Sequence, residues 1–185
     1  MQIKHGLLHP AKFIASPNYD ARPENTDIDL LVIHCISLPR GEFDNHNIEA
    51  LFLNKINPQL HPSFKELANL KVSAHLVIYR DGAVVQFVPF HARAWHAGVS
   101  CFQGKNNCND FSIGIELEGT DDADYLPIQY EKLIVITKLL CQTYRGIIPE
   151  RIVGHSEIAG KRKTDPGLLF DWSYYKQQVF GDTIP

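Results

Sequence analysis

The sequence contains no apolar run close to the about 20 residues that a membrane-spanning helix requires, so we expect no part of it to cross a membrane. Residues 1–10 lack the continuous apolar core of a secretory signal, which makes the cytoplasm the expected compartment. A formal net charge of −3 offers no basic surface for nucleic acid, apart from a short cluster at 161–163. We therefore expect a soluble globular protein without a nucleic acid, membrane or obligate protein partner.

Cysteine is scarce and forms no metal or redox motif. The four cysteines include no C-x-x-C pair, and in a reducing cytoplasm they are expected to be thiols; they are Cys35, Cys101, Cys108 and Cys141. Cys101 and Cys108 can bridge only in an oxidising medium. Cys35 follows His34 in an extended segment, where neighbouring side chains point to opposite faces, so we assign Cys35 to the core.

The length of 185 residues suits a single domain, 1–185, with its core from about residue 16 to about residue 180. Strand-like and helix-like segments alternate without repeats or a long linker. This pattern predicts an α/β (α+β) fold with a central mixed sheet of about five to six strands flanked by helices. A turn at 80–82 predicts that the strands on either side of it form an antiparallel hairpin. Strands are expected at 30–35, 74–79, 83–88, 112–118 and 151–154.

The clearest helix is expected at 127–144, where apolar residues recur at helical spacing, with a proline in the first turn and a glycine just past the end. Shorter helices are expected at about 47–55 and 172–179. Two stretches, 57–72 and 89–110, show no periodicity. Long irregular segments in a compact domain are often binding loops, so these two stretches are candidates for that role.

Three residues far apart in the sequence have the chemistry of a zinc site. Each of two histidines ends an apolar run, and an aspartate lies in a Thr-Asp-Pro-Gly turn; these are His34, His155 and Asp165. Zn²⁺ favours imidazole nitrogen and carboxylate oxygen, and a catalytic site typically has three protein ligands and a fourth position for water. A single histidine after an apolar run is more often a core or surface residue with ordinary hydrogen bonds. The pattern therefore nominates these ligands without pairing them.

The fourth expected strand alternates apolar and polar residues, so Gly114, Glu116 and Glu118 share its polar face. That face is either solvated, as is common in antiparallel sheets, or carries a functional carboxylate. Gly114 would leave space above the sheet for a ligand. Elsewhere, Trp95 is either a core anchor or a platform for a sugar or peptide, and His75 within a strand is more often structural.

Several motifs together resemble one enzyme family. They are Ser-Pro-Asn-Tyr-Asp at 16–20, Leu-Val-Ile-His at 31–34, the segment 36–43, Val-Ser-Ala-His at 72–75, Ala-Trp-His-Ala-Gly-Val-Ser at 94–100, the segment 108–120 and Arg-Lys-Thr-Asp-Pro-Gly at 162–167. The chain resembles the zinc-dependent N-acetylmuramoyl-L-alanine amidases, a family similar in fold to peptidoglycan recognition proteins and phage lysozyme-type amidases. The motifs run in order from about residue 16 to about residue 172, so the resemblance covers nearly the whole chain.

The resemblance implies one zinc ion per chain and roles for five residues. His34, His155 and Asp165 resemble the zinc ligands, Glu116 the catalytic glutamate, and Lys163 the lysine that assists at the developing oxyanion. The implied reaction is hydrolysis of the amide between the lactyl group of N-acetylmuramic acid, in its 1,6-anhydro form, and L-alanine of the stem peptide. The implied substrates are soluble, imported anhydromuropeptides, and the implied role is cell-wall recycling with control of β-lactamase induction.

The resemblance also implies substrate contacts at Lys71, His75, Trp95 and Asn107. Lys71 stands where arginine is usual, Asn107 where a basic residue can contact substrate, and Cys35 where asparagine is expected. Arginine grips a carboxylate with two parallel hydrogen bonds and lysine cannot, so these departures affect substrate contact rather than the chemistry. Two alternatives stay open: a recognition module that keeps the cleft without catalysis, and an amidase that acts on intact peptidoglycan.

Overall fold

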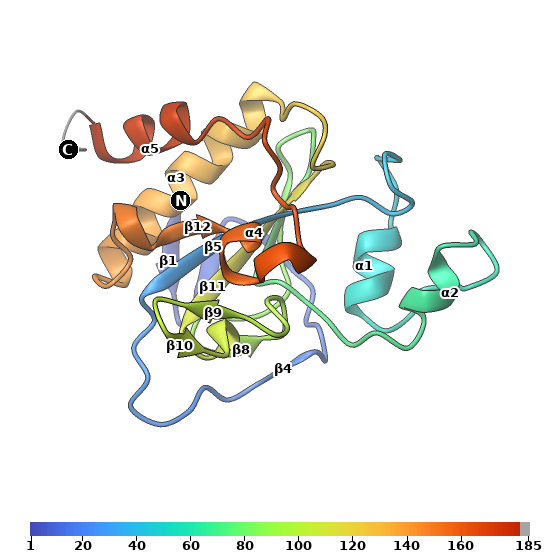
Figure 1. Cartoon of the computed structure of the whole chain (residues 1–185), viewed down its shortest axis with the longest axis horizontal. Helices are drawn as coiled ribbons and strands as arrows, with labels where there is room; N and C mark the ends of the chain where they lie inside the picture. The colour runs from blue at the N-terminus through green and yellow to red at the C-terminus, as the bar shows by residue number, and fades with distance from the viewer. Residues whose placement is uncertain (182–185) are drawn as a thin grey trace.

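Figure 1 shows the computed structural model, which describes residues 1–181; the last residues of the predicted domain, 182–185, lie outside the described part. A mixed sheet of six strands forms the centre, in the order β12-β5-β11-β6-β7-β3. The prediction of a mixed sheet of five to six strands flanked by helices is confirmed. Its strands are β3 (Lys12–Phe13), β5 (Leu30–Ile36), β6 (Leu76–Ile78), β7 (Val84–Gln86), β11 (Ser112–Glu118) and β12 (Ile152–Gly154).

The pairing within this sheet brings three chain segments to one edge. Strands β12, β5 and β11 are neighbours and parallel, and β6 is parallel to β11. The register sets Glu116 of β11 opposite His34 of β5, and Gly154 of β12 opposite Ile33. Because neighbouring strands lie about 4.8 Å apart, side chains at these carboxyl ends lie side by side. Strands β6 and β7 form the predicted antiparallel hairpin around the turn at 80–82.

Two helices cover one face of the sheet, α3 (Pro127–Thr143) and α5 (Trp172–Phe180), and they lie next to each other in Figure 1. Helix α3 begins at the expected proline. Its apolar stripe packs on the sheet in a core that includes Leu31, Ile33, Ile113, Ile115, Leu133, Ile136 and Leu140. Cys35 packs against this same core, as predicted, but it is only partly buried. All four cysteines are free thiols, as expected.

The opposite face is covered by short elements and irregular chain. Helices α1 (Asn47–Phe52) and α2 (Phe64–Leu67) stand to one side of the sheet in Figure 1, and α4 (His155–Ile158) follows β12 directly. Three short antiparallel ribbons complete the fold. They pair β1 (Gln2–Lys4) with β2 (Leu7–His9), β4 (Tyr19–Asp20) with β8 (Arg93–Ala94), and β9 (Cys101–Phe102) with β10 (Lys105–Asn106); single 3-10 turns lie at Cys108–Asp110, Pro149–Arg151 and Gly160–Arg162.

The N-terminal segment differs from the expectation. Leu8 is buried in the main core, and β3 forms an edge of the sheet by pairing with β7, so the core begins before residue 16. Helix α1 ends at Phe52, three residues earlier than the expected end at 55. Among the helices of the described residues, none combines the length and the hydropathy that a membrane span needs.

Candidate metal centre

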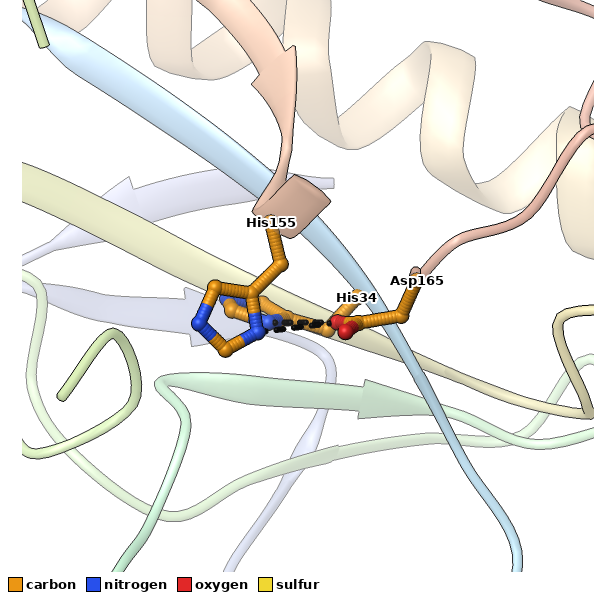
Figure 2. A group of neighbouring side chains, drawn as sticks. All are labelled: His34, His155 and Asp165. Atoms are coloured by element: carbon orange, nitrogen blue, oxygen red, sulfur yellow. Dashed lines mark hydrogen bonds and ion pairs between the residues drawn. The ribbon is translucent and has the colours of Figure 1, made fainter. Parts of the chain in front are cut away.

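His34, His155 and Asp165 converge at one point although no local spacing joins them (Figure 2). The Oδ2 atom of Asp165 lies 3.1 Å from the Nδ1 atom of His34 and 3.1 Å from the Nδ1 atom of His155. One ligand atom from each residue lies within 4.8 Å of the other two. The structure thus brings together the three residues that the sequence nominated separately, from β5, the start of α4 and the loop that follows α4.

The position of His155 is fixed at the junction where strand β12 ends and helix α4 begins. It comes directly after β12, and the N–H of Gly154 donates to Oε1 of Glu157 at 2.7 Å, which fixes the start of α4. The N–H of Ser156 donates to the carbonyl oxygen of Asp165 at 3.0 Å. One backbone hydrogen bond therefore ties the segment that carries one candidate ligand to the segment that carries another.

The loop that carries Asp165 is fixed on its far side as well. The hydroxyl of Tyr125 donates to the carbonyl oxygen of Pro166 at 2.7 Å. Gly167 has a φ of +96°, and a Cβ atom there would collide with the carbonyl of Asp121, so only glycine fits. The Thr-Asp-Pro-Gly turn therefore presents the carboxylate from a constrained backbone.

The protonation of these groups suits a metal. Burial lowers the pKa of His34 to about 4, against the opposing effect of Asp165, so the imidazole is neutral at neutral pH. Burial alone would raise the pKa of Asp165, but its contacts with His155 and His34 outweigh that effect and lower the pKa below its usual range. Metals bind neutral imidazole and ionised carboxylate. Two imidazole nitrogens and one carboxylate oxygen on fixed supports are a donor set that fits a catalytic Zn²⁺.

Glu116 lies beside this centre and is only partly buried, but one of its oxygens is fully enclosed. Its Oε2 atom has no hydrogen-bond partner within residues 1–181. Burial raises the pKa of Glu116 well above its usual value, the charge of Asp165 raises it further, and Lys163 lowers it. The neighbouring residues on this face of β11 are buried, so the interpretation of a simply solvated face is wrong. An enclosed, unpaired carboxylate oxygen is costly, and its place in the same cavity as the three candidate ligands makes Glu116 a candidate functional group.

These groups open into one cavity of about 240 Å³. Glu116 and the three candidate ligands line this cavity, together with Lys163, which is an exposed residue. Both irregular stretches that were candidate binding loops contribute to the wall, the second through Trp95. Six further lining residues are apolar and are called the apolar wall below: Leu38, Leu51, Phe52, Leu67, Leu70 and Val72.

Comparison with known proteins agrees with this geometry. The profile of the N-acetylmuramoyl-L-alanine amidase family matches residues 24–168. The chain belongs to this family. The amidase is 54% identical over 175 residues to the 1,6-anhydro-N-acetylmuramyl-L-alanine amidase AmpD of Enterobacter cloacae, covering 95% of this chain and 93% of the relative.

Solved structures give the same result. The crystal structure of a Se-Met AmpD derivative matches the amidase with a TM-score of 0.94 at 51% identity, covering 97% of this chain and 99% of the other. AmiD from Escherichia coli, in complex with the substrate anhydro-N-acetylmuramic acid-L-Ala-D-γ-Glu-L-Lys, matches with a TM-score of 0.62 at 30% identity, covering 86% of this chain and 61% of AmiD.

The four predicted substrate contacts of the amidase fall in different places. Trp95 lines the cavity, and its Nε1 donates to Asp20 Oδ1 at 3.1 Å, which fixes the ring. Lys71 is exposed and lies between two residues of the apolar wall, and Asn107 is exposed with a φ of +60°. Both stay predictions.

The expected contact between His75 and substrate is wrong. His75 is fully buried, and its Nδ1 accepts the N–H of Gly114 at 3.0 Å. Because Nδ1 accepts, Nε2 carries the proton and donates to the carbonyl oxygen of Ala92 at 3.2 Å. Both ring nitrogens are therefore occupied inside the protein, and His75 supports the backbone of β11 instead.

Sequence reasoning missed His96. A Cβ atom at Gly114 would collide with the His96 ring, so the space that Gly114 was expected to leave for a ligand is filled by this imidazole. His96 Nδ1 lies 2.9 Å from His34 Nε2, and His96 Nε2 lies 3.1 Å from Ser112 Oγ. The sequence signal that could have identified His96 was a glycine on the functional face of a strand, together with a histidine in an irregular segment.

Proposed function

We propose that this amidase uses one zinc ion to hydrolyse the amide between the lactyl group of 1,6-anhydro-N-acetylmuramic acid and L-alanine of the stem peptide. The observation that carries the proposal is the convergence of His34, His155 and Asp165 beside the unpaired oxygen of Glu116. The choice of substrate is supported by the relative that is named for the 1,6-anhydro form and by the related AmiD, which binds an anhydromuropeptide as substrate.

Amide hydrolysis needs both a strong nucleophile and a proton for the leaving amine, because the carbonyl is a weak electrophile and the amine a poor leaving group. The proposed zinc ligands are His34, His155 and Asp165, in a 2-His-1-carboxylate arrangement. When bound, Zn²⁺ supplies a Lewis acid that polarises a carbonyl oxygen and lowers the pKa of a water molecule toward about 7.

Glu116 is proposed to move the proton. Its Oε2 atom has no competing partner in the described chain, so it is free to accept a proton from the attacking water and to return it to the departing nitrogen. Enclosure raises the pKa of this carboxyl group well above its ordinary value, which makes the ionised group a stronger base toward the attacking water. The register with His34 on the neighbouring strand keeps the carboxyl group beside the metal centre.

Lys163 is proposed to stabilise the negative oxygen of the tetrahedral intermediate. It lines the same cavity as Glu116 and the ligands, and its positive charge reaches Glu116 strongly enough to lower the pKa of that group. Trp95 and the apolar wall would pack against the sugar and the alanine methyl group and exclude bulk water. The amidase would thereby hold the scissile bond between a metal, a base and a cation.

The substrate class also suggests a cellular role. Anhydromuropeptides reach the cytoplasm as imported wall fragments, so we place the amidase in the cytoplasm and in cell-wall recycling. Four free cysteines fit a reducing compartment. In bacteria in which these fragments act as signals, their removal would control the induction of β-lactamase.

Mass spectrometry of the products formed from anhydromuropeptide, with and without a chelator, tests reaction, substrate and metal together. We expect release of the intact stem peptide, loss of that release with chelator, and recovery on addition of zinc. A protein that binds zinc but releases no peptide would be a recognition module. Faster release from insoluble sacculus than from soluble anhydromuropeptide would instead favour an amidase for intact peptidoglycan.

A further inference from the structure

Two consecutive residues hold the outward nitrogens of both candidate zinc histidines. Nε2 of His155 lies 3.1 Å from the carbonyl oxygen of Ala97, and Nε2 of His34 lies 2.9 Å from Nδ1 of His96. The N–H groups of His96 and Ala97 both donate to Oδ1 of Asn109, at 3.1 and 2.8 Å. One amide side chain therefore fixes the segment that contacts both histidines.

The protons of these contacts can be assigned from the partners. A carbonyl oxygen only accepts, so Nε2 of His155 carries a proton, and its Nδ1 lone pair is free to face the metal position. His34 needs the same tautomer to bind a metal through Nδ1. Its Nε2 then donates, and Nδ1 of His96 must be the acceptor.

The far side of His96 completes this assignment. With Nδ1 accepting, neutral His96 carries its proton on Nε2, which lies 3.1 Å from Oγ of the fully buried Ser112. A serine hydroxyl can accept that hydrogen bond. The order from the metal outward is then His34, His96, Ser112, with every proton pointing away from the metal. Gly114 makes room for the His96 ring over β11.

We propose that His96 is a positioning residue of the zinc centre, which accepts the Nε2 proton of His34 and passes the hydrogen bond on to Ser112. The proposal rests on the proposed zinc-dependent function. Such a bond fixes the tautomer and the ring orientation of a ligand histidine and increases its basicity. An apolar side chain of similar size would fill the space but leave the Nε2 proton of His34 without an acceptor.

Two substitutions separate this role from simple packing. His96→Leu removes the acceptor, and loss of a partner of this kind lowers metal affinity about 10- to 100-fold. His96→Asn is the matched control, because Oδ1 of asparagine can take the place of the imidazole Nδ1 and accept from His34. We expect His96→Asn to recover most of the zinc affinity, measured by competition with a chromophoric chelator. Far-UV circular dichroism of the zinc-free variants reports whether each has folded.

Nitrogen-15 NMR of zinc-loaded wild-type protein tests the proposal without a variant, because it reports which ring nitrogen of each histidine carries the proton. We expect both His34 and His96 to carry their protons on Nε2. A His96 proton on Nδ1, or folded His96→Leu that binds zinc as tightly as wild type, would overturn the proposal. Wild-type protein that binds no zinc at all would instead overturn the proposed metal centre, so the two failures are distinguishable.

Discussion

Replacement of Glu116 by glutamine is the sharpest test of the proposed chemistry. The amide has almost the same size and removes only the ability to accept a proton at Oε2, an atom with no other partner within residues 1–181. A positioned general base contributes about 10²- to 10⁴-fold to a rate. At 1.36 kcal/mol per tenfold change, we expect kcat to fall by the equivalent of about 3 to 5 kcal/mol. Zinc should stay bound, because Glu116 is not among the converging ligand atoms.

Glu118 provides the matched control. It lies two residues further along β11, is buried, has a pKa raised by burial, and also has one unpaired buried oxygen, Oε1. Its Oε2, however, accepts the N–H of Arg80 at 3.1 Å, and Glu118 does not line the cavity of the candidate zinc ligands. Glu118→Gln should therefore leave kcat within a few-fold of wild type. The assay is release of peptide from anhydromuropeptide, with zinc content measured by mass spectrometry. Near-normal turnover by zinc-loaded Glu116→Gln would remove Glu116 from the mechanism.

Glu116→Gln should also raise the stability of the zinc-free protein, by an amount that depends on pH. The pKa of Glu116 in the folded chain lies well above its ordinary value of 4.5, so folding favours the protonated form. The stability contributed by this group is complete below that ordinary pKa and is lost as pH rises through the raised one. Glutamine does not titrate. Zinc-free Glu116→Gln should therefore melt at a higher temperature than wild type at alkaline pH, and the difference should shrink as the pH falls toward the ordinary pKa.

Three further changes have defined outcomes. Asp165→Ala removes one of the three converging donors, so zinc and activity should be lost together; retention of tightly bound zinc would contradict the ligand assignment. Lys163 lowers the pKa of Glu116, so Lys163→Gln should move the acid limb of the pH–rate profile to higher pH and should also lower kcat. An acid limb at the same pH as in wild type would argue against an electrostatic effect of Lys163 on Glu116. Gly114→Ala should displace the His96 ring and weaken zinc binding as His96→Leu does; unchanged affinity in a chelator competition would show that the ring has another place to go.

The central strands were predictable because their sequences carry the pattern. Strands β5 and β11 are seven residues long, and apolar residues of both strands form the core on one face of the sheet. On the other face β5 is still largely apolar, whereas β11 carries serine, glycine and glutamate. The strands of two residues were not predictable. Lys12–Phe13 joins the sheet only because β7 offers it an edge, and a pair of residues is too short to show any period.

The candidate ligands were nominated by residue type and by position at the ends of apolar runs, but their meeting depends on the parallel register of β12, β5 and β11. The role of His96 was harder to predict, because the side chain that it contacts lies 62 residues earlier in the chain. Gly114 does mark a place of close approach, but the prediction that it leaves space for a ligand was wrong, because the His96 ring fills that space. The side chain that approaches comes from the protein itself rather than from a ligand.

The apolar wall of the cavity and its reactive side have separate origins in the chain. The reactive groups Glu116, His34 and His155 belong to the parallel strands or directly follow them, whereas the wall comes mainly from the excursion that holds α1 and α2. An exchange of that excursion between relatives should therefore alter which stem peptides or sugars are accepted while the affinity for the ion is preserved. Natural variation and laboratory engineering could accordingly change substrate selectivity through the segment that holds α1 and α2. Reactivity would be changed through residues at the buried strand ends.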